Sequence, residues 1–277
     1  MHQWTKRALL LLALIGFGLG VDAFFIEPAR LVVNRRELRL PRFPAELSGM
    51  RVALLSDLHV GSPHWGLSRL HELVSRVNAE KPDLILLAGD YLINDIWFGT
   101  HVAADPIAAE LAQLHAPLGV FAALGNHDWW NDGPKVRAAL EAHGVTVLDD
   151  EVRRLRFNGK EFCLLGVRDE TQRVRSAQSV LDLAVPGIPL IVLVHEPDLF
   201  ADLDERATLT LAGHTHGGQV DLPLLGRSVV PSRYGARYAA GHIVEGGRHL
   251  FVTTGVGTSI IPVRFGVPPE IALLTLH

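Results

Sequence analysis

Five short apolar runs in this sequence each end in histidine, aspartate or asparagine. With the polar residues that follow them, the runs are 51–56 before Asp57-Leu58-His59, 83–88 before Gly89-Asp90, 120–124 before Gly125-Asn126-His127-Asp128, 189–194 before His195-Glu196, and 208–212 before Gly213-His214-Thr215-His216. A short apolar run closed by turn-forming residues is typical of a buried strand. Because open α/β sheets bind ligands beyond the carboxyl ends of their strands, this repetition predicts one polar site along one sheet edge.

Helices are predicted between these strands. Residues 67–78 carry apolar side chains with the period of a helix and lie between the first two strands. Residues 106–114 predict a second helix, and residues 134–143 predict a third that begins at Pro134 and ends before Gly144. Strand, helix and strand in this order predict a βαβ unit, whose strands are parallel.

The second half of the chain is richer in short strands. They are predicted at residues 145–148, 151–157, 161–167, 251–254 and 271–276, with Asn158-Gly159 as a hairpin turn. We therefore expect an α/β fold, a four-layer αββα sandwich in which two mixed β-sheets pack face to face and helices flank them. Residues 49–277 would form this one domain.

The first 27 residues predict a membrane segment. Lys6-Arg7 precede the apolar residues 8–21, and residues 23–26 extend the segment past Asp22. We favour an uncleaved anchor in the cell (inner) membrane, since residues 8–26 approach the length that spans a bilayer. The alternative is an export signal peptide cleaved near Val21-Asp22-Ala23. The side of the membrane stays open, because basic residues both precede and follow the segment.

Residues 28–48 are predicted to be a linker with an edge strand. Three prolines, Pro28, Pro41 and Pro44, surround the alternating Leu38-Arg39-Leu40. Proline cannot donate a hydrogen bond to a sheet, so a strand among prolines belongs at a sheet edge.

Charge and cysteine content exclude several classes of function. The formal net charge of −4 over 277 residues leaves no basic footprint, so a nucleic acid polymer is not an expected partner. Cys163 is the single cysteine, which rules out an intramolecular disulfide and a multi-cysteine zinc site. Its apolar neighbours predict a buried, structural thiol.

Seven oxygen and nitrogen donors at the strand ends predict a metal centre. Asp57 and His59 are two residues apart and would point the same way if their strand continued, so both could reach one metal. Asp90 has two carboxylate oxygens, enough to bridge two cations. The predicted ligands are Asp57, His59, Asp90, Asn126, His195, His214 and His216. Two divalent ions sharing Asp90 fit this set, and its oxygen-rich, thiolate-free chemistry favours manganese, with iron or zinc possible.

The motifs, in this order, resemble those of the calcineurin-like metallophosphoesterase superfamily. Within it, the run 213–219 and the tail 264–271 look like the membrane-associated YkuE/YaeI group of phosphodiesterases. The resemblance implies one metal on Asp57, His59, Asp90 and His216, and a second on Asp90, Asn126, His195 and His214. It also implies that His127 faces the phosphate and leaving group, oriented by Asp128, while a hydroxide bridging the metals attacks phosphorus.

The loop after Gly89-Asp90 narrows the range of expected substrate classes. The phosphoprotein phosphatases that this sequence resembles carry an Asp-Arg pair shortly after the Gly-Asp motif. Residues 91–98 of this chain contain no arginine and are mostly aromatic and aliphatic. Together with Trp129-Trp130, these side chains either cover the sheet edge or form an apolar lip for a lipid or sugar-lipid substrate.

We therefore expect a dinuclear metallophosphoesterase that hydrolyses a phosphodiester or pyrophosphate bond. The favoured substrate is lipid-linked, of the UDP-2,3-diacylglucosamine pyrophosphate type. A soluble (cyclic) nucleotide is the alternative substrate. A membrane-tethered scaffold with a relic metal site is the alternative outside enzymes. The sequence leaves the oligomeric state open.

Arg264 stands among apolar residues in a predicted tail loop. It would either form a salt bridge, with Glu270 as the candidate partner, or fold over the metals and offer its planar guanidinium to a substrate phosphate.

Overall fold

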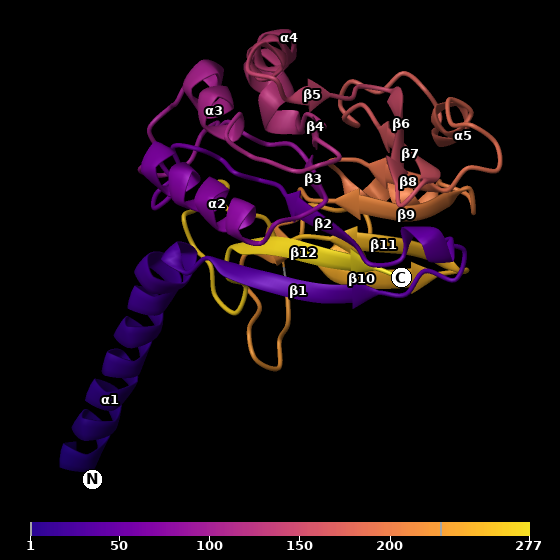
Figure 1. Cartoon of the computed structure of the whole chain (residues 1–277). Coiled ribbons are helices and arrows are strands. Elements are labelled where there is room, and N and C mark those ends of the chain that lie inside the picture. Colours follow the sequence, from indigo (N-terminus) through magenta and orange to yellow (C-terminus); the bar gives the residue numbers. More distant parts are fainter. Residues whose placement is uncertain (1, 228) are drawn as a thin grey trace.

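The computed structural model describes residues 2–227 and 229–277, which form two β-sheets packed face to face (Figure 1). The first sheet contains, in spatial order, β1 (Val32–Leu38), β12 (Glu270–Leu276), β2 (Met50–Leu55), β3 (Leu84–Leu87), β4 (Val120–Ala122) and β5 (Thr146–Val147). The second contains β10 (Gly241–Glu245), β11 (Arg248–Val252), β9 (Ala207–Ala212), β8 (Leu190–Leu193), β7 (Lys160–Gly166) and β6 (Glu151–Phe157). Both sheets are mixed, since parallel neighbours such as β2–β3 and β8–β9 accompany antiparallel pairs such as β12–β2 and β6–β7.

The central strands are apolar throughout because both of their faces are buried. In β2, Val52 and Leu54 join the core between the two sheets, whereas Ala53 and Leu55 belong to the core under the helices. Successive side chains of a strand point to opposite faces, so a strand covered on both sides needs a continuous apolar run.

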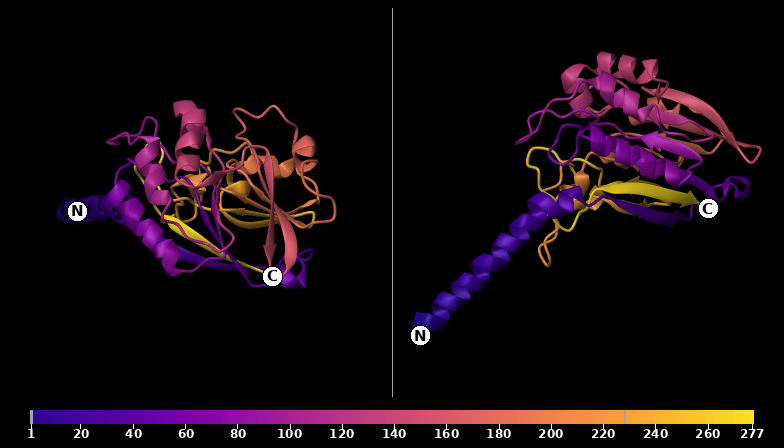
Figure 2. Two further views of the ribbon diagram at one scale, coloured as in Figure 1. Left: turned by 45° about the horizontal axis from the view of Figure 1, so that its top comes forward. Right: turned by 60° about the vertical axis from the view of Figure 1, so that its left-hand side comes forward.

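Helices cover the outer face of the first sheet. They are α2 (Leu67–Ala79), α3 (Ala104–Leu111) and α4 (Asn126–Ala142) (Figure 2). The second sheet has a thinner cover, made of α5 (Ala177–Leu181) and the 3-10 turns Pro197–Ala201 and Gly235–Tyr238. The predicted sandwich of two mixed sheets flanked by helices is confirmed.

Several boundaries differ from the sequence prediction, and two of them matter for the site and the sheet edge. α4 begins at Asn126, eight residues before Pro134, and bends at Asp132, whose φ of −177° and ψ of 84° are not helical. The polar residues that suggested a loop are its first turn. The edge strand is β1, which ends at Leu38, the first residue of the Leu38-Arg39-Leu40 pattern, so most of the strand precedes that pattern. β1 does lie at the sheet edge, paired with β12.

An exposed apolar helix projects from the domain (Figure 1). α1 (His2–Val21) continues into a π-helical turn (Asp22–Ile26) and a 3-10 turn (Glu27–Ala29). The stretch Gln3–Ala29 is long and apolar enough to cross a membrane, and an 18-residue window within it has a mean hydropathy of 2.4. It is consistent with an anchor or with a signal sequence.

The end of this stretch is fastened to the domain. The main-chain NH of Arg264 donates a hydrogen bond to the carbonyl of Ala23 at 2.9 Å. The indole NH of Trp65 donates to the carbonyl of Pro28 at 2.9 Å, and Glu27 and Pro28 are buried. β1 follows within a few residues, so the direction of α1 is set by the domain.

Candidate metal centre

The strand ends bring the seven predicted donors together. Asp57 and His59 follow β2, Asp90 follows β3, Asn126 opens α4 after β4, His195 follows β8, and His214 and His216 follow β9. Donor atoms of Asp57, His59 and His216 lie within 4.8 Å of one another, as do those of Asp90, His195 and His214. We call these the first and the second cluster. Both sheets contribute, so the centre forms only when the sandwich is assembled.

Five of these residues have a left-handed backbone. The φ angles are 53° at Asp57, 39° at His59, 58° at Asp90, 70° at His214 and 51° at His216. Such φ values are uncommon for residues other than glycine and cost about 1–3 kcal/mol each. The expectation that β2 continues through Asp57 and His59 is wrong, because β2 ends at Leu55. Sharp turns, not strand alternation, bring these side chains together.

The nitrogens of the first cluster face one another. His59 Nε2 lies 3.1 Å from His216 Nε2. His216 Nε2 lies 3.4 Å from Asp57 Oδ1, and His59 Nε2 lies 3.6 Å from an oxygen of Asp90. Burial lowers the pKa of His59 to about 3 and also lowers the pKa of His216. Two neutral imidazole nitrogens converging with carboxylate oxygens are the donor set that suits a divalent cation.

The second cluster also joins imidazole nitrogens with carboxylate and amide oxygens, but here burial is outweighed by the Asp90 carboxylate, which raises the pKa of His195. His214 Nδ1 lies 3.1 Å from His195 Nε2, which is 3.2 Å from Asp90 Oδ2 and 3.2 Å from Asn126 Oδ1. Burial lowers the pKa of His214 to about 4. Asp90 Oδ2 therefore faces His59 in one cluster and His195 in the other, as expected for a carboxylate shared by two ions.

Main-chain carbonyls orient two of the imidazoles. His59 Nδ1 lies 3.1 Å from the carbonyl of Leu92, and His195 Nδ1 lies 2.6 Å from the carbonyl of Ala88. A carbonyl only accepts hydrogen bonds, so each Nδ1 donates, and Nε2 is the ring nitrogen that faces the clusters. The residues present thus fit a dinuclear centre.

Asp128 supports the backbone rather than His127. Its buried carboxylate accepts hydrogen bonds from the main-chain NH groups of Asp90 at 2.8 Å, Gly125 at 2.9 Å and Tyr91 at 2.9 Å. Burial raises the pKa of Asp128 to about 7. The expected contact of Asp128 with the His127 ring is not among its hydrogen bonds, because these NH groups occupy the carboxylate. Asp128 instead joins the loop of Asp90 to the first turn of α4.

His127 lies at the edge of both clusters. Its main-chain NH donates to Asp90 Oδ1 at 2.9 Å. Its ring packs edge-on against His59, with centroids 4.7 Å apart, and tilted against Trp130 at 4.9 Å. Burial lowers the pKa of its imidazole. Neighbouring rings, and not Asp128, orient this side chain.

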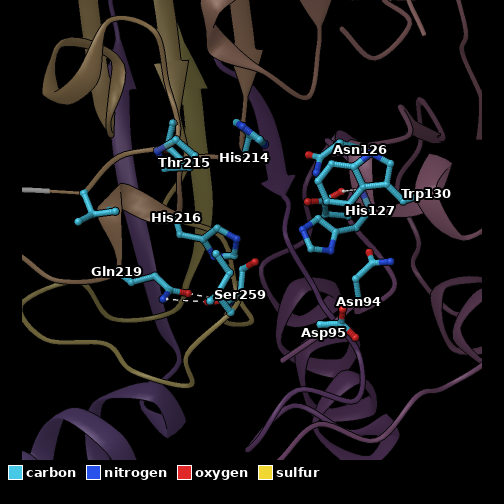
Figure 3. A pocket seen from close by; sticks show the side chains of 15 residues that line it. Asn94, Asp95, Asn126, His127, Trp130, His214, Thr215, His216, Gln219 and Ser259 are labelled. Carbon is cyan, nitrogen blue, oxygen red and sulfur yellow. Dashed lines mark hydrogen bonds between the residues drawn. The ribbon is translucent and has the colours of Figure 1, made fainter. Parts of the chain in front are cut away.

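A cavity of about 480 Å³ opens onto the clusters (Figure 3). His127, Asn126 and Trp130 line one side, and His214 and His216 line the other (Figure 3). The rim includes exposed apolar side chains, Trp130, Val229 and Ile260. Trp129 turns away to pack against the core beneath the helices. Of the two adjacent tryptophans, Trp130 lines the cavity and Trp129 does not.

The sequence prediction missed some of the polar lining. Asn94, Asp95, Gln219 and Ser259 also border the cavity. Gln219 joins two of its walls, since its side-chain oxygen accepts from the NH of Ser259 at 2.7 Å and its amide donates to the carbonyl of Ile261 at 3.2 Å. Gln219 could have been found from the sequence, because it lies three residues after the Gly213–His216 motif.

Arg264 is fully buried and does not line the cavity. Its guanidinium donates to the main-chain carbonyls of Gly257 at 2.6 Å, Thr254 at 2.9 Å and Val267 at 3.0 Å. Of the two alternatives, the structure places neither a cavity contact nor an ion pair with Glu270 at this guanidinium, which these three bonds occupy. Gly257 in turn donates from its NH to the carbonyl of Asp57 at 2.6 Å. Arg264 therefore supports the loop behind the first cluster.

We expect Arg264→Lys to lower the melting temperature by about 5 °C or more, because the single nitrogen of a lysine cannot reach carbonyls that the guanidinium meets from three separate nitrogens, and each lost bond costs about 1–3 kcal/mol. Calorimetry of the metal-loaded variant measures the shift, and kcat/KM per folded molecule should change little. Arg156→Lys, at a side chain that is 65% exposed, is the control. An unchanged melting temperature with a reduced kcat/KM would contradict this structural role and support a contact between Arg264 and the substrate.

Comparison with known proteins agrees with this centre. The family model for calcineurin-like phosphoesterases matches residues 50–218, a span that includes all seven donors. The chain is 31% identical to the metallophosphoesterase YkuE of Bacillus subtilis over 94% of this chain and 90% of that one. It is 33% identical to the phosphodiesterase YaeI of Escherichia coli over 91% and 90%. A Danio rerio transmembrane protein with a metallophosphoesterase domain is 31% identical over 87% of this chain and 56% of its own.

These matches run through both sheets and through every strand end that carries a donor, and they confirm the resemblance seen in the sequence. The buried histidine and aspartate clusters are those of a dinuclear hydrolase of phosphoric esters. The chain belongs to the calcineurin-like phosphoesterase family and is a metal-dependent phosphoesterase.

Proposed function

We propose that the seven donors hold two divalent cations that share Asp90. The first ion would lie on Asp57, His59, Asp90 and His216, and the second on Asp90, Asn126, His195 and His214. The position of Asp90 Oδ2, 3.6 Å from His59 Nε2 and 3.2 Å from His195 Nε2, is the observation that carries this assignment. Manganese is the favoured ion, because the oxygen-rich donor set without thiolate suits it, while iron or zinc also matches the donors.

His127 is proposed as the residue that meets the leaving group. Bound cations supply charge neutralisation at the phosphate and lower the pKa of water. The imidazole of His127 lines the cavity beside the clusters, so it is placed to donate a hydrogen bond or a proton to the departing oxygen. Asp128 acts indirectly, by fixing the backbone of Asp90 and Gly125.

The proposed substrate is a lipid-linked phosphodiester or pyrophosphate, with the UDP-2,3-diacylglucosamine type favoured. The apolar rim at Trp130, Val229 and Ile260 supports an acyl-bearing ligand. α1 supports a location at the inner membrane as an uncleaved anchor, and the relative from Danio rerio is named as a transmembrane protein. A soluble (cyclic) nucleotide stays the second candidate, since the polar side chains of Asn94, Asp95 and Gln219 could hold a base.

A substrate panel tests this proposal on the full chain. The purified protein, with its metal content measured on the same sample, is assayed with a UDP-diacylglucosamine pyrophosphate in vesicles, with cyclic nucleotides and with bis(p-nitrophenyl) phosphate. We expect the highest kcat/KM for the lipid-linked pyrophosphate. A preference for cyclic nucleotides, unchanged by added lipid, would support the second candidate. Inactivity of the manganese-loaded protein on all three would support a scaffold with a relic site.

A further inference from the structure

A short hairpin near the cavity exposes two leucines at its tip. Leu222 and Gly226 close it through two main-chain hydrogen bonds, of 3.1 and 2.7 Å. Leu224 is fully exposed and Leu225 is 78% exposed. Leu224 also has a φ of 69°, a left-handed conformation that is rare for a branched apolar residue. Water is a poor environment for two adjacent large apolar side chains held out on a strained turn.

The hairpin is tied to the same segment that holds the end of α1. Asp221, at the base of the hairpin, donates from its NH to the carbonyl of Phe265 at 2.8 Å. The next residue back, Arg264, donates from its NH to the carbonyl of Ala23 at 2.9 Å. Because the two contacts are made by the adjacent residues Arg264 and Phe265, they hold the hairpin and the segment after α1 next to the same part of the chain.

The hairpin and α1 also point to the same side of the molecule. In Figure 1 and in the right panel of Figure 2, the orange loop that carries residues 222–227 extends below the sheets, on the side toward which α1 projects. Other exposed apolar side chains are Phe25, in the π-helical turn after α1, and Val229 and Ile260 on the cavity rim. If α1 crosses a bilayer, these exposed apolar side chains are the part of the domain that faces the bilayer surface.

Two basic side chains stand beside the hairpin. Arg36 and Arg227 line one depression together with Gly266, Pro268 and Glu270, and Arg227 also pairs with Asp221 at the base of the hairpin at 3.2 Å. Arginine at the border of an apolar surface suits the phosphate layer of a membrane, while leucine suits the acyl layer beneath it. The exposed Arg36 and the exposed leucines of the hairpin are side chains of these two kinds.

We propose that Leu224 and Leu225 insert into the leaflet from which α1 emerges, so that the cavity mouth at Val229 and Ile260 opens onto lipid. The partner is a phospholipid bilayer. This inference rests on the proposed anchoring by α1, and it adds that the catalytic domain itself contacts the membrane in one orientation. A lipid-linked substrate then reaches the clusters without leaving the bilayer.

A depth-sensitive label on the full chain tests the insertion. Cys163 is free and buried, so Leu224→Cys adds one accessible thiol for the fluorophore NBD. Val174→Cys, at an 87% exposed apolar residue in the loop before α5, is the matched control. In vesicles of phosphatidylethanolamine and phosphatidylglycerol we expect a blue-shifted emission, quenched by acyl-chain spin labels, at position 224 only. Equal quenching at both positions, or none at either, would overturn the proposal.

A blue shift without lipid quenching that grows with protein density would mean that a second copy or another protein covers the leucines, and would equally overturn it. The label needs no turnover, so its outcome is independent of the substrate panel. In addition, the double variant Leu224→Glu and Leu225→Glu should lose about tenfold or more in kcat/KM on a vesicle-embedded pyrophosphate substrate. Its kcat/KM for bis(p-nitrophenyl) phosphate should stay at the wild-type value, which shows that the domain is folded.

Discussion

Replacing Asp90 by alanine is expected to remove bound metal and phosphoesterase activity together. Asp90 Oδ2 faces a histidine of each cluster, so its loss takes a ligand from both proposed ions at once. Metal assistance is worth several kcal/mol, so kcat/KM should fall by about three orders of magnitude or more. Elemental analysis of the purified variant, with activity assayed on bis(p-nitrophenyl) phosphate, measures both effects in one sample.

The matched control is Asp95→Ala, which removes another carboxylate from the same cavity. Asp95 belongs to neither cluster, so this variant should keep the metal content of the wild type. Two ions per chain in the Asp90 variant would end the assignment of Asp90 as the shared ligand.

Replacing His127 by alanine is expected to leave metal in place and lower kcat by about 10²- to 10⁴-fold, the usual contribution of an acid to leaving-group departure. The reason is position, since His127 lines the cavity beside the clusters but is proposed as a ligand of neither ion. The loss should be smaller for p-nitrophenyl esters than for alkyl esters, because a nitrophenolate leaves without a proton.

The control for lost ring packing is Trp130→Ala, since Trp130 packs against the His127 ring from the solvent side. It should reduce turnover of both ester classes alike. If His127→Ala loses its metal, or slows both ester classes equally, His127 is not the group that assists the leaving oxygen.

The strand ends were predictable from sequence because central strands of this sandwich are buried on both faces. Leu84–Leu87 and Leu190–Leu193, for example, are apolar at every position, and the change to polar residues marks the sheet edge in the sequence itself. The order of the motifs along the chain then identifies the family.

The supporting contacts were not predictable in the same way. Asp128 and Arg264 are each satisfied by main-chain groups, and a main-chain NH or carbonyl has the same chemistry at every residue. The partners of Arg264 are fixed by loop conformation, which leaves no periodic signal. The start of α4 at Asn126 was hidden for a related reason, since its first turn carries site residues in place of an amphipathic pattern.

The left-handed backbone at five of the seven donors links folding to metal supply. Without cations, the folded state keeps the torsional cost at these residues together with buried carboxylates and imidazoles that crowd one another. Cations that bind the folded chain shift the unfolding equilibrium by mass action, in proportion to the logarithm of their free concentration. In a metal-starved cell more of the chain would stay unfolded and open to proteolysis, so the abundance of the enzyme, and not only its turnover, would follow the ion it uses.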